Sequence, residues 1–220
     1  MGLAAVQATF AKLQLTNLIR MSILFCMVRT RTFDPNSALT SAVELFASKG
    51  YSETSMEDIV QATGVSRYGL YSAFGNKREL FELALERFAD GMGKKSFLRL
   101  LEPDASLDHI RGIFRDRVED MCCLEENKGC LFVHTAMQLA PQDDETRDVL
   151  KGFMKRMSKA FSAGLTSAKE RGEIRADVDV RAAGELLTST MFGLAVLGRT
   201  GFEQGSLDGI VDNTLASMTG

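Results

Sequence analysis

The chain has 220 residues, of which 45% are apolar and 25% are charged, and its formal net charge is −3. This is the composition of an ordinary globular protein, and a chain of this length can bury roughly 70% of its unfolded surface. Only three prolines and many leucine, alanine, methionine and glutamate residues favour helices over β-sandwiches or barrels. The small negative charge excludes a polybasic nucleic-acid-binding tail, so any contact with DNA must come from a local patch.

The first 26 residues are moderately apolar, but they lack the basic start and the small-residue cleavage site of a signal peptide. We expect 1–28 to be an extension that is poorly ordered or that precedes the true start at Met27. An amphipathic arm that packs on the body or on a membrane surface is the alternative. No apolar run reaches 18 residues, so we expect no membrane span.

The first two helices are predicted from their capping residues. Asp34 is a suitable N-cap, and Pro35 suits the first position of a helix that ends at Gly50. Residues 54–57 have the spacing of a capping box, in which the Thr54 hydroxyl and the Glu57 carboxylate each accept a backbone N–H. A second helix therefore follows and ends at Gly64.

A third, very short helix is expected to start at Ser66 and to end at Gly75. The residues of 76–79 cap a fourth helix that runs to about Gly91. Longer helices follow beyond residue 95, and the whole chain is predicted to be all-α. It has a three-helix head with a helix-turn-helix, joined by a fourth helix to a larger helical bundle, with about nine helices in total. The later helices are placed near 106–126, 129–140, 143–171, 179–199 and 203–218, with breakers at Gly129, Pro141, Gly172 and Gly201.

Residues 55–74 have the layout of a helix-turn-helix motif, because two short helices meet at a tight turn that contains Gly64. Val65, Leu70 and Phe74 are placed to bury one side of the second helix. The second helix of such a motif enters a major groove with its N-terminal residues forward. Over residues 28–92 there are seven basic and nine acidic side chains, so a focused contact is predicted rather than a generally basic domain.

The polar side of that second helix carries groups that can recognise DNA. Arg67 can donate a bidentate pair of hydrogen bonds to guanine, and Ser66 or Tyr68 can contact a base edge or a phosphate. Asn76 and Lys77 lie at the next helix N-terminus, where backbone N–H groups favour a phosphate. Gly69 would keep the surface low enough for close approach of the backbone.

The stretch "TSMEDIVQATGVSRYGLYSAFGNKRELFELALERF" (54–88) resembles the DNA-binding head of the TetR family of bacterial transcriptional regulators. The matching motifs are Val65-Ser66-Arg67, Leu70-Tyr71-x-x-Phe74 and Lys77, and the resemblance covers about 32–92. This chain departs from the family at Tyr68-Gly69, where many members have glycine and then a small residue. Operator preference is therefore not carried over at those two positions.

The resemblance implies a homodimeric repressor that binds a palindromic double-stranded DNA operator and is released by a small-molecule inducer. It implies a DNA-binding domain at 32–92, a ligand-binding and dimerisation domain at 93–220, no cofactor and no metal. Tyr71 and Lys77 would contact phosphates, and Arg29 and Arg31 would reach a minor groove. The DNA-binding residues expected are Arg29, Arg31, Thr54, Ser55, Ser66, Arg67, Tyr68, Gly69, Tyr71, Asn76 and Lys77.

The last two long helices, at about 179–199 and 203–218, are expected to form the dimer interface of the family. The first of them is apolar on more than one face, and Gly184, Gly193 and Gly198 would permit close helix approach. A monomer core that uses the same residues is the alternative.

Four cysteines occur without a CxxC pair, which favours reduced thiols in a cytoplasmic protein: Cys26, Cys122, Cys123 and Cys130. The Gly-Cys-Leu-x-Val run at 129–133 resembles a subgroup of the family in which this helix lines the ligand cavity and some members sense electrophiles or oxidants through thiols. A helix N-terminus lowers the pKa of a thiol, but free cysteines are more often buried and inert, so both interpretations of Cys130 remain open.

The candidate pocket or sensor residues are Cys122, Cys130, Phe132, His134 and Met137. A metal site that uses Cys130 and His134 is disfavoured because no compact ligand cluster exists. The leading function is a repressor controlled by a small apolar ligand or by thiol modification. The alternatives are a dimeric small-molecule-binding protein that does not bind DNA, and an enzyme with Cys130 as nucleophile and His134 as base.

Overall fold

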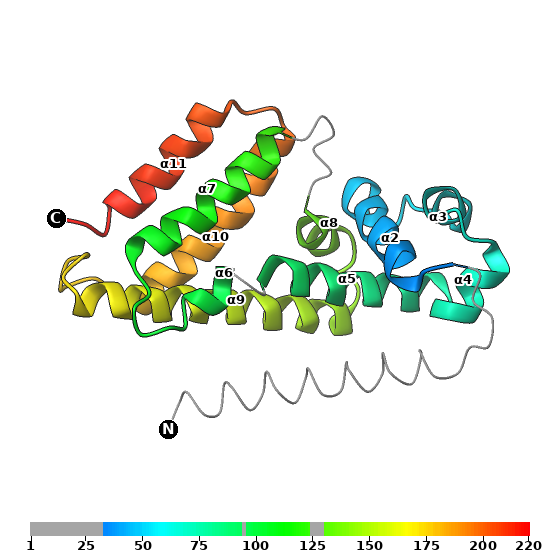
Figure 1. Ribbon diagram of the computed structural model, residues 1–220, viewed down its shortest axis with the longest axis horizontal. Coiled ribbons are helices and arrows are strands. Elements are labelled where there is room, and N and C mark those ends of the chain that lie inside the picture. The colour runs from blue at the N-terminus through cyan, green and yellow to red at the C-terminus, as the bar shows by residue number, and fades with distance from the viewer. Residues whose placement is uncertain (1–32, 94–95, 124–129) are drawn as a thin grey trace, which may run out of the picture.

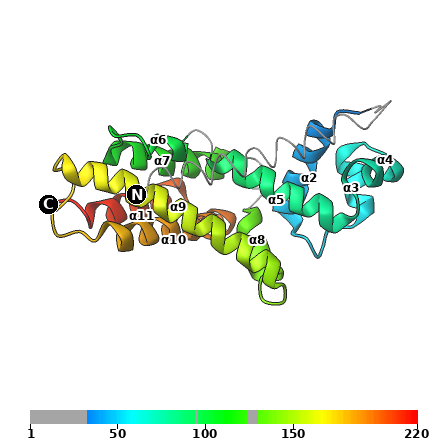
Figure 2. The same cartoon turned by 90° about the horizontal axis from the view of Figure 1, so that it is seen from below.

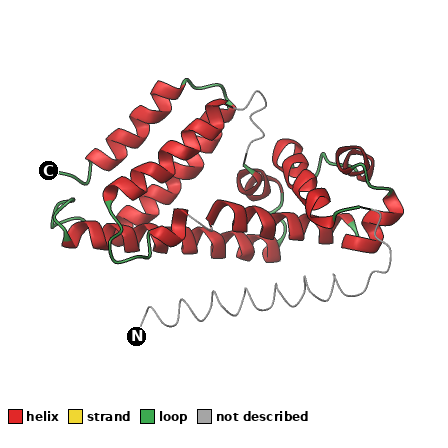
Figure 3. Cartoon of the chain, in the orientation of Figure 1, coloured by secondary structure: helices red, strands yellow, loops and turns green. Residues whose placement is uncertain are grey.

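The computed structural model describes residues 33–93, 96–123 and 130–220, and all regular structure in these ranges is helical (Figure 3). The all-α prediction is therefore confirmed. Ten helices occur there instead of about nine, because the four-residue helix α6 was not predicted. The helices are α2 Pro35–Lys49, α3 Met56–Thr63, α4 Arg67–Phe74, α5 Lys77–Gly93, α6 Ser96–Arg99, α7 Leu107–Cys123, α8 Leu131–Gln138, α9 Asp144–Glu170, α10 Val180–Arg199 and α11 Gln204–Ala216.

The molecule is elongated, with α2, α3 and α4 gathered at one end and α7, α10 and α11 at the other (Figure 1). Helix α5 leads from the head into the body, and the 27-residue helix α9 runs along the body. The view from below shows the same separation of head and body (Figure 2). The fourth predicted helix therefore joins the two parts, as expected.

The caps of α2, α4 and α5 are those that the sequence predicts. The Asp34 carboxylate accepts the backbone N–H groups of residues 36 and 37, and Ser66 Oγ accepts the Gly69 N–H at 3.2 Å. Gly64 ends α3 in the left-handed conformation, with φ 67° and ψ 9°, which only glycine adopts without strain. The turn between α3 and α4 is thus specified locally by residue type.

The predicted capping box of α3 is wrong by one residue. Ser55, not Thr54, is the N-cap, and it exchanges hydrogen bonds with Asp58: Ser55 Oγ accepts the Asp58 N–H at 3.1 Å, and the Asp58 carboxylate accepts the Ser55 N–H at 2.8 Å. Thr54 is buried and donates its hydroxyl to the Gly50 carbonyl at 2.6 Å. The error arises because Asp58 closes the box as well as a glutamate would, which leaves Glu57 free to point elsewhere.

A continuous apolar core extends from the head into the body. The Phe88 ring on α5 lies 5.5 Å from the Phe132 ring on α8, which stacks on Phe153 of α9 at 4.1 Å between centroids. Five large apolar side chains of the body are buried in this core: Phe114, Phe132, Phe153, Met157 and Phe161. Met137 is 76% exposed, because it lies on the outer side of the short helix α8.

Polar contacts from three body elements hold the head in place. The Arg78 guanidinium at the start of α5 contacts the Asp143 carboxylate at 2.5 Å and the Thr146 hydroxyl at 2.8 Å, at the N-terminus of α9. Arg199 at the end of α10 donates to the Ser48 carbonyl of α2 at 2.8 Å. The Gln138 side chain of α8 lies against the head at Gly50. The orientation of the head therefore depends on exposed and half-buried polar groups as well as on the core.

One helix of the described ranges, α10, is long and apolar enough to cross a membrane by length and composition alone. No such segment was expected, because no apolar run of the sequence reaches 18 residues. A core helix passes the same test, and α10 packs mainly on α9 with its buried residues. Its charged residues Arg181, Glu185 and Arg199 lie near its two ends. We interpret α10 as a core helix of the body.

Gly184 on α10 has a packing role inside the chain. A Cβ at this position would meet the Ser158 carbonyl oxygen at 2.7 Å and also the Ser162 hydroxyl, both on α9. Because glycine has no side chain, α9 and α10 can approach each other closely at Gly184. A Cβ at Gly193, by contrast, would meet nothing within 4 Å in the described chain.

We expect Gly184→Ala to destabilise the fold by about 1–3 kcal/mol, because the new methyl group must displace a backbone carbonyl. Urea denaturation followed by circular dichroism measures this change. Gly112→Ala on α7 is the matched control, because open space surrounds it and alanine stabilises an open helix position by up to about 1 kcal/mol over glycine. Equal stability of the Gly184 variant and the wild type would contradict the close packing of α9 and α10.

Asp143→Asn is expected to weaken the contact between α5 and α9 in a pH-dependent way. Hydrogen bonding from the Thr146 N–H and pairing with Arg78 lower the pKa of Asp143 from 3.8 to about 2. The ionised carboxylate therefore stabilises the fold fully above its unfolded-state pKa, and this stabilisation is lost as the pH falls toward 2. Asparagine keeps the helix cap but removes the charge that faces Arg78.

In urea titrations at a series of pH values, the Asp143→Asn variant should be less stable than the wild type at neutral pH. The two should converge between pH 3.8 and about 2. Asp148→Asn, at an exposed position one turn further along α9, is the control for loss of a carboxylate. A stability difference that persists unchanged to pH 2 would refute the role of the Asp143 charge.

Candidate nucleic-acid interface

Helix α4 presents a polar face to solvent and an apolar face to the head. Tyr68 is 83% exposed and Tyr71 is 44% exposed, and Ser66 and Arg67 are also exposed. Val65, Leu70, Ala73 and Phe74 are buried. The apolar side therefore anchors α4, and the side chains at its N-terminus are accessible to a partner, in the geometry that a major groove requires.

Arg67 is not isolated on this surface. Its guanidinium lies 3.0 Å from the Glu57 carboxylate on α3, and both side chains are more than half exposed. Sequence reasoning missed this pair, because it placed Glu57 in the capping box. Glu57 and Arg67 are ten residues apart, and only the observed angle between α3 and α4 brings them together.

Gly69 packs closely against the interior of the head, in addition to the close approach to DNA that the sequence suggested. A Cβ at this position would lie 3.0 Å from the Val65 side chain and 3.4 Å from the Phe33 ring. The contact with Val65 is tighter than an ordinary van der Waals distance, so a side chain at this position would require Val65 to shift by a few tenths of an ångström. The neighbouring Tyr68 has no such restriction and points into solvent.

The start of α5 lies beside this face. The Asn76 side chain caps the helix, because its Oδ1 accepts the backbone N–H groups of Arg78 at 2.8 Å and Glu79 at 3.1 Å. The Lys77 ammonium lies 4.2 Å from the centre of the Tyr51 ring. Partial burial lowers the pKa of Lys77, and the charges of Asp58 and Glu53 oppose that effect. Lys77 is thus a positioned cation held against an aromatic ring.

The remaining predicted contacts fall into three groups. Ser55 is exposed, although its hydroxyl is engaged in the cap of α3. Thr54 is buried, so its side chain is not available to DNA and it is removed from the predicted contacts. Arg29 and Arg31 lie outside the described residues.

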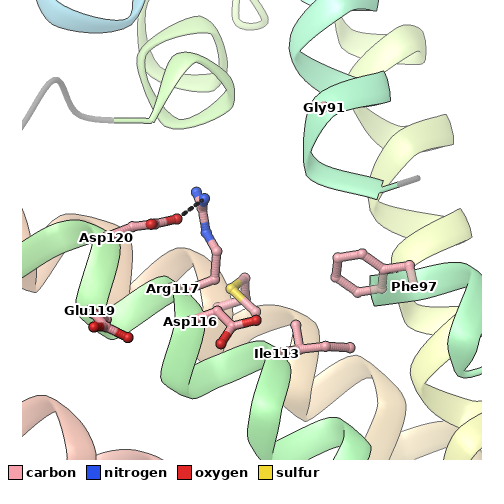
Figure 4. A pocket seen from close by; sticks show the side chains of 8 residues that line it. Gly91, Phe97, Ile113, Asp116, Arg117, Glu119 and Asp120 are labelled. Atoms are coloured by element: carbon pink, nitrogen blue, oxygen red, sulfur yellow. Dashed lines mark hydrogen bonds and ion pairs between the residues drawn. The ribbon is translucent and has the colours of Figure 1, made fainter. Parts of the chain in front are cut away.

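A cavity of ≈ 440 Å³ lies in the body, between the end of α5, helix α6, helix α7 and helix α10 (Figure 4). Phe97 and Ile113 form apolar walls, and Arg117 extends from α7 with its guanidinium 3.3 Å from Asp120. The buried Arg117 Nε has no hydrogen-bond partner in the described part of the chain. The lining residues are Gly91, Phe97, Ile113, Asp116, Arg117, Glu119, Asp120 and Met191.

None of the five residues predicted for the pocket or sensor lines this cavity. Phe132 belongs to the core, Met137 faces solvent, and His134 is partly buried with its pKa lowered by burial and by Arg199. The spacing of Ile113, Arg117 and Asp120 along α7 gives one helix face. That face was the available signal in the sequence, and it was overlooked because charged residues on a helix are usually solvated.

The two cysteines with described side chains differ in accessibility. Cys122 is exposed and Cys130 is buried, and neither of the two forms a disulfide. Burial raises the pKa of the Cys130 thiol, although the backbone N–H groups of Val133 and Phe132 oppose this shift. This direction agrees with the buried, inert interpretation of Cys130, because the loss of solvent outweighs the hydrogen bonds from those N–H groups. No group of three or more metal-ligating side chains occurs within the described ranges.

Comparison with known proteins decides the family. A family model described as bacterial regulatory proteins of the tetR family matches 38–84, and a tetracyclin repressor-like C-terminal domain matches 106–205. The Bacillus subtilis HTH-type transcriptional regulator YezE is 30% identical over 193 residues, which cover 87% of this chain and all of that protein. The chain belongs to the TetR family of bacterial regulatory proteins. The resemblance seen in residues 54–88 is thus confirmed.

Other TetR-family proteins agree with this assignment. The Escherichia coli repressor ComR is 28% identical over 188 residues, which cover 85% of this chain and 90% of ComR. The structure of a cysteine mutant of the TetR-family regulator CifR with 26-bp double-stranded operator DNA is 25% identical, with a TM-score of 0.74, over 87% of this chain and all of that one. The reduced form of E. coli NemR shares the fold at 15% identity and a TM-score of 0.67, over 83% of this chain and 94% of that one. This chain is therefore a DNA-binding transcriptional regulator of the TetR family.

Proposed function

We propose that the chain is a homodimeric repressor that binds a palindromic operator and leaves it when the body receives a chemical signal. The observation that supports this proposal is the exposed N-terminal half of α4, which carries Ser66, Arg67 and Tyr68 at the end of an elongated molecule. Two such helices related by a twofold axis reach successive major grooves when they are about 34–36 Å apart.

In this proposal the residues divide into base readers and phosphate binders. Arg67 and Tyr68 read base edges, with Gly69 allowing close approach. Ser66 and Tyr71 border the same groove. Asn76, Lys77 and the N-terminus of α5 bind an adjoining phosphate, and Ser55 at the N-terminus of α3 binds another. Arg29 and Arg31 remain proposed minor-groove contacts from the segment before α2.

The proposed domain boundaries separate the DNA-binding head from the body. Residues 32–92 form the DNA-binding domain, with the helix-turn-helix at 55–74, and 93–220 form the ligand-binding and dimerisation domain, while 1–28 is an extension. A regulator of bacterial genes works in the cytoplasm, where thiols stay reduced. We propose no catalytic role, because the raised pKa of Cys130 is the opposite of what a thiol nucleophile needs.

The dimer interface is proposed on α10 and α11, at 179–199 and 203–218. Leu186 and Val196 are each 47% exposed on α10, and Phe202 in the connection to α11 is 48% exposed. Gly193 lies on the same exposed side of α10 with open space around it. These residues suit contact with the α10–α11 pair of a second copy. If they form the dimer interface, the Leu186→Glu variant should sediment as a monomer.

The signal is proposed to be a small ligand with an apolar body that occupies the cavity at α7. Phe97, Ile113 and Met191 provide apolar contact, and Arg117 offers a buried donor with no partner in the described chain. The ligand needs only to bind the released conformation more tightly than the DNA-bound one, and a coupling of about 1–3 kcal/mol changes operator affinity roughly 5–150-fold. Modification of a thiol is the second candidate signal, and the exposure of Cys122 supports that residue as its target.

Variants of the recognition surface should lose DNA binding without loss of fold. Lys77→Ala should weaken binding to every duplex and reduce the slope of log affinity against log salt by about 1, as expected for a phosphate contact. Arg67→Ala should cost about 1–3 kcal/mol and relax preference at one base pair. Tyr71→Ala combined with Lys77→Ala should abolish operator binding.

Gel shifts and salt titrations with an operator selected from random duplexes measure these effects. Lys155→Ala, an exposed lysine of α9 in the body, is the control for loss of a positive charge. Circular dichroism verifies the fold of each variant. Unchanged footprints for the Tyr71 and Lys77 double variant would show that the assigned face is wrong.

The two candidate signals are separated by peptide mapping after mild peroxide treatment. We expect oxidation at Cys122 before Cys130, because Cys130 is buried with a raised pKa. If Cys122→Ser still releases DNA on oxidation, the signal does not pass through Cys122. If oxidation leaves DNA binding of the wild type intact, the thiol candidate fails and the cavity ligand remains.

A further inference from the structure

The recognition surface contains an acidic residue that the fold does not require. Glu57 lies in the first turn of α3, and its side chain is 72% exposed. The cap of α3 is closed by Ser55 and Asp58, so Glu57 takes no part in it. Its carboxylate Oε1 instead lies 3.0 Å from the nearer terminal nitrogen of Arg67, which is the first residue of α4.

The Glu57–Arg67 pair contributes little to stability, because ion pairs between exposed side chains are screened by water and salt. On the proposed DNA-binding face, the Glu57 carboxylate lowers the affinity for DNA, since a carboxylate repels the phosphate backbone. Lys49 pairs with Asp58 at 2.8 Å, so the neighbouring acid has its own partner and does not compete for Arg67. Glu57 is therefore the acid that can control the recognition arginine.

We propose that Glu57 is a specificity-determining residue that holds the Arg67 guanidinium until DNA offers a better set of acceptors. This inference rests on the proposed role of α4 as the recognition helix. A guanine edge presents two acceptors, O6 and N7, that match the guanidinium fork, so it replaces the carboxylate with a bidentate pair. A phosphate on a non-cognate duplex offers a contact without sequence information, and Glu57 competes with it directly.

The consequence is an asymmetry between cognate and non-cognate DNA. On the operator, loss of the Glu57 contact is offset by the guanine pair. On other duplexes, breaking the ion pair yields only a phosphate contact, so Arg67 stays with Glu57. Glu57 thereby lowers non-specific affinity more than operator affinity.

The experiment compares wild type, Glu57→Gln, Glu53→Gln and Arg67→Ala as full-length proteins. Binding is measured by fluorescence anisotropy on an operator selected in vitro by the wild type and on a scrambled duplex of the same composition. Glu53 is the matched control, because it is an exposed acid of the same head whose charge acts on Lys77. Both glutamine variants change the net charge by the same amount, so the change in overall electrostatic attraction to DNA is the same for both.

We expect Glu57→Gln to raise affinity for the scrambled duplex by about fivefold, the upper range for an exposed ion pair, and to raise operator affinity less. The salt dependence on the scrambled duplex should steepen by about one counterion, because Arg67 becomes free to contact a phosphate. Glu53→Gln should shift both affinities equally. In an Arg67→Ala background, Glu57→Gln should no longer change the ratio of the two affinities.

An equal shift of both affinities by Glu57→Gln, as for Glu53→Gln, would overturn the inference and leave the proposed function intact. A change of ratio that persists without Arg67 would also overturn it, because the pair would then not be the cause. Failure of Arg67→Ala to weaken operator binding would refute the assignment of the recognition face itself, and the inference with it.

Discussion

The aromatic cluster of Phe46, Tyr51 and Phe81 joins the head to the helix that carries it. The Phe81 ring of α5 lies 5.1 Å from Phe46 and 4.8 Å from Tyr51, and Phe46 and Phe81 are fully buried. Because α5 continues from this cluster into the body, the packing of Phe81 determines where the whole head lies. The Tyr51 ring also supports Lys77, so the same cluster places a cation at the start of α5.

Two kinds of interaction thus hold the head, and they differ in how easily they change. The core from Phe81 through Phe88 to Phe132 is apolar and continuous, and it maintains the connection under all conditions in which the protein is folded. The contacts of Arg78, Gln138 and Arg199 lie near the surface, and such contacts are individually weak. Polar contacts of this kind are exchanged more easily than the packed aromatic core, because each is weak and accessible to water.

Much of the head was predictable because its signals are local. Five residues act on the backbone of their immediate neighbours, and each has its predicted role at a helix end: Asp34, Pro35, Gly64, Ser66 and Gly75. The pairing of Glu57 with Arg67 was not predictable, since it depends on the angle between two helices. Similarly, the buried state of Thr54 and the shift of the cap to Ser55 depend on which hydroxyl the fold turns inward.

The helices of the body were predicted from the sequence, but the residues predicted for its pocket do not line the observed cavity. The helix boundaries follow from glycines and apolar spacing, yet the cavity forms where α5, α6, α7 and α10 meet. The face of α7 that borders the cavity is visible in the sequence, but it does not by itself indicate which other helices complete the site. Charged side chains on a helix are usually solvated, whereas Arg117 of α7 borders the cavity. Likewise, Gly184 was expected at a contact between copies, whereas the structure gives it a role in the contact of α10 with α9 of the same chain.

The Arg78–Asp143 contact has a consequence for how binding data on this protein are interpreted. A protein that binds DNA releases counterions, and added salt weakens binding because it reduces the free-energy gain from that release. The same salt weakens the ion pair between the head and the body. A salt titration of operator binding therefore reports two processes at once, the loss of phosphate contacts and a loosening of the head. The slope does not equal a count of phosphates for this protein, whereas differences between variants with an intact Arg78 contact still isolate individual contacts.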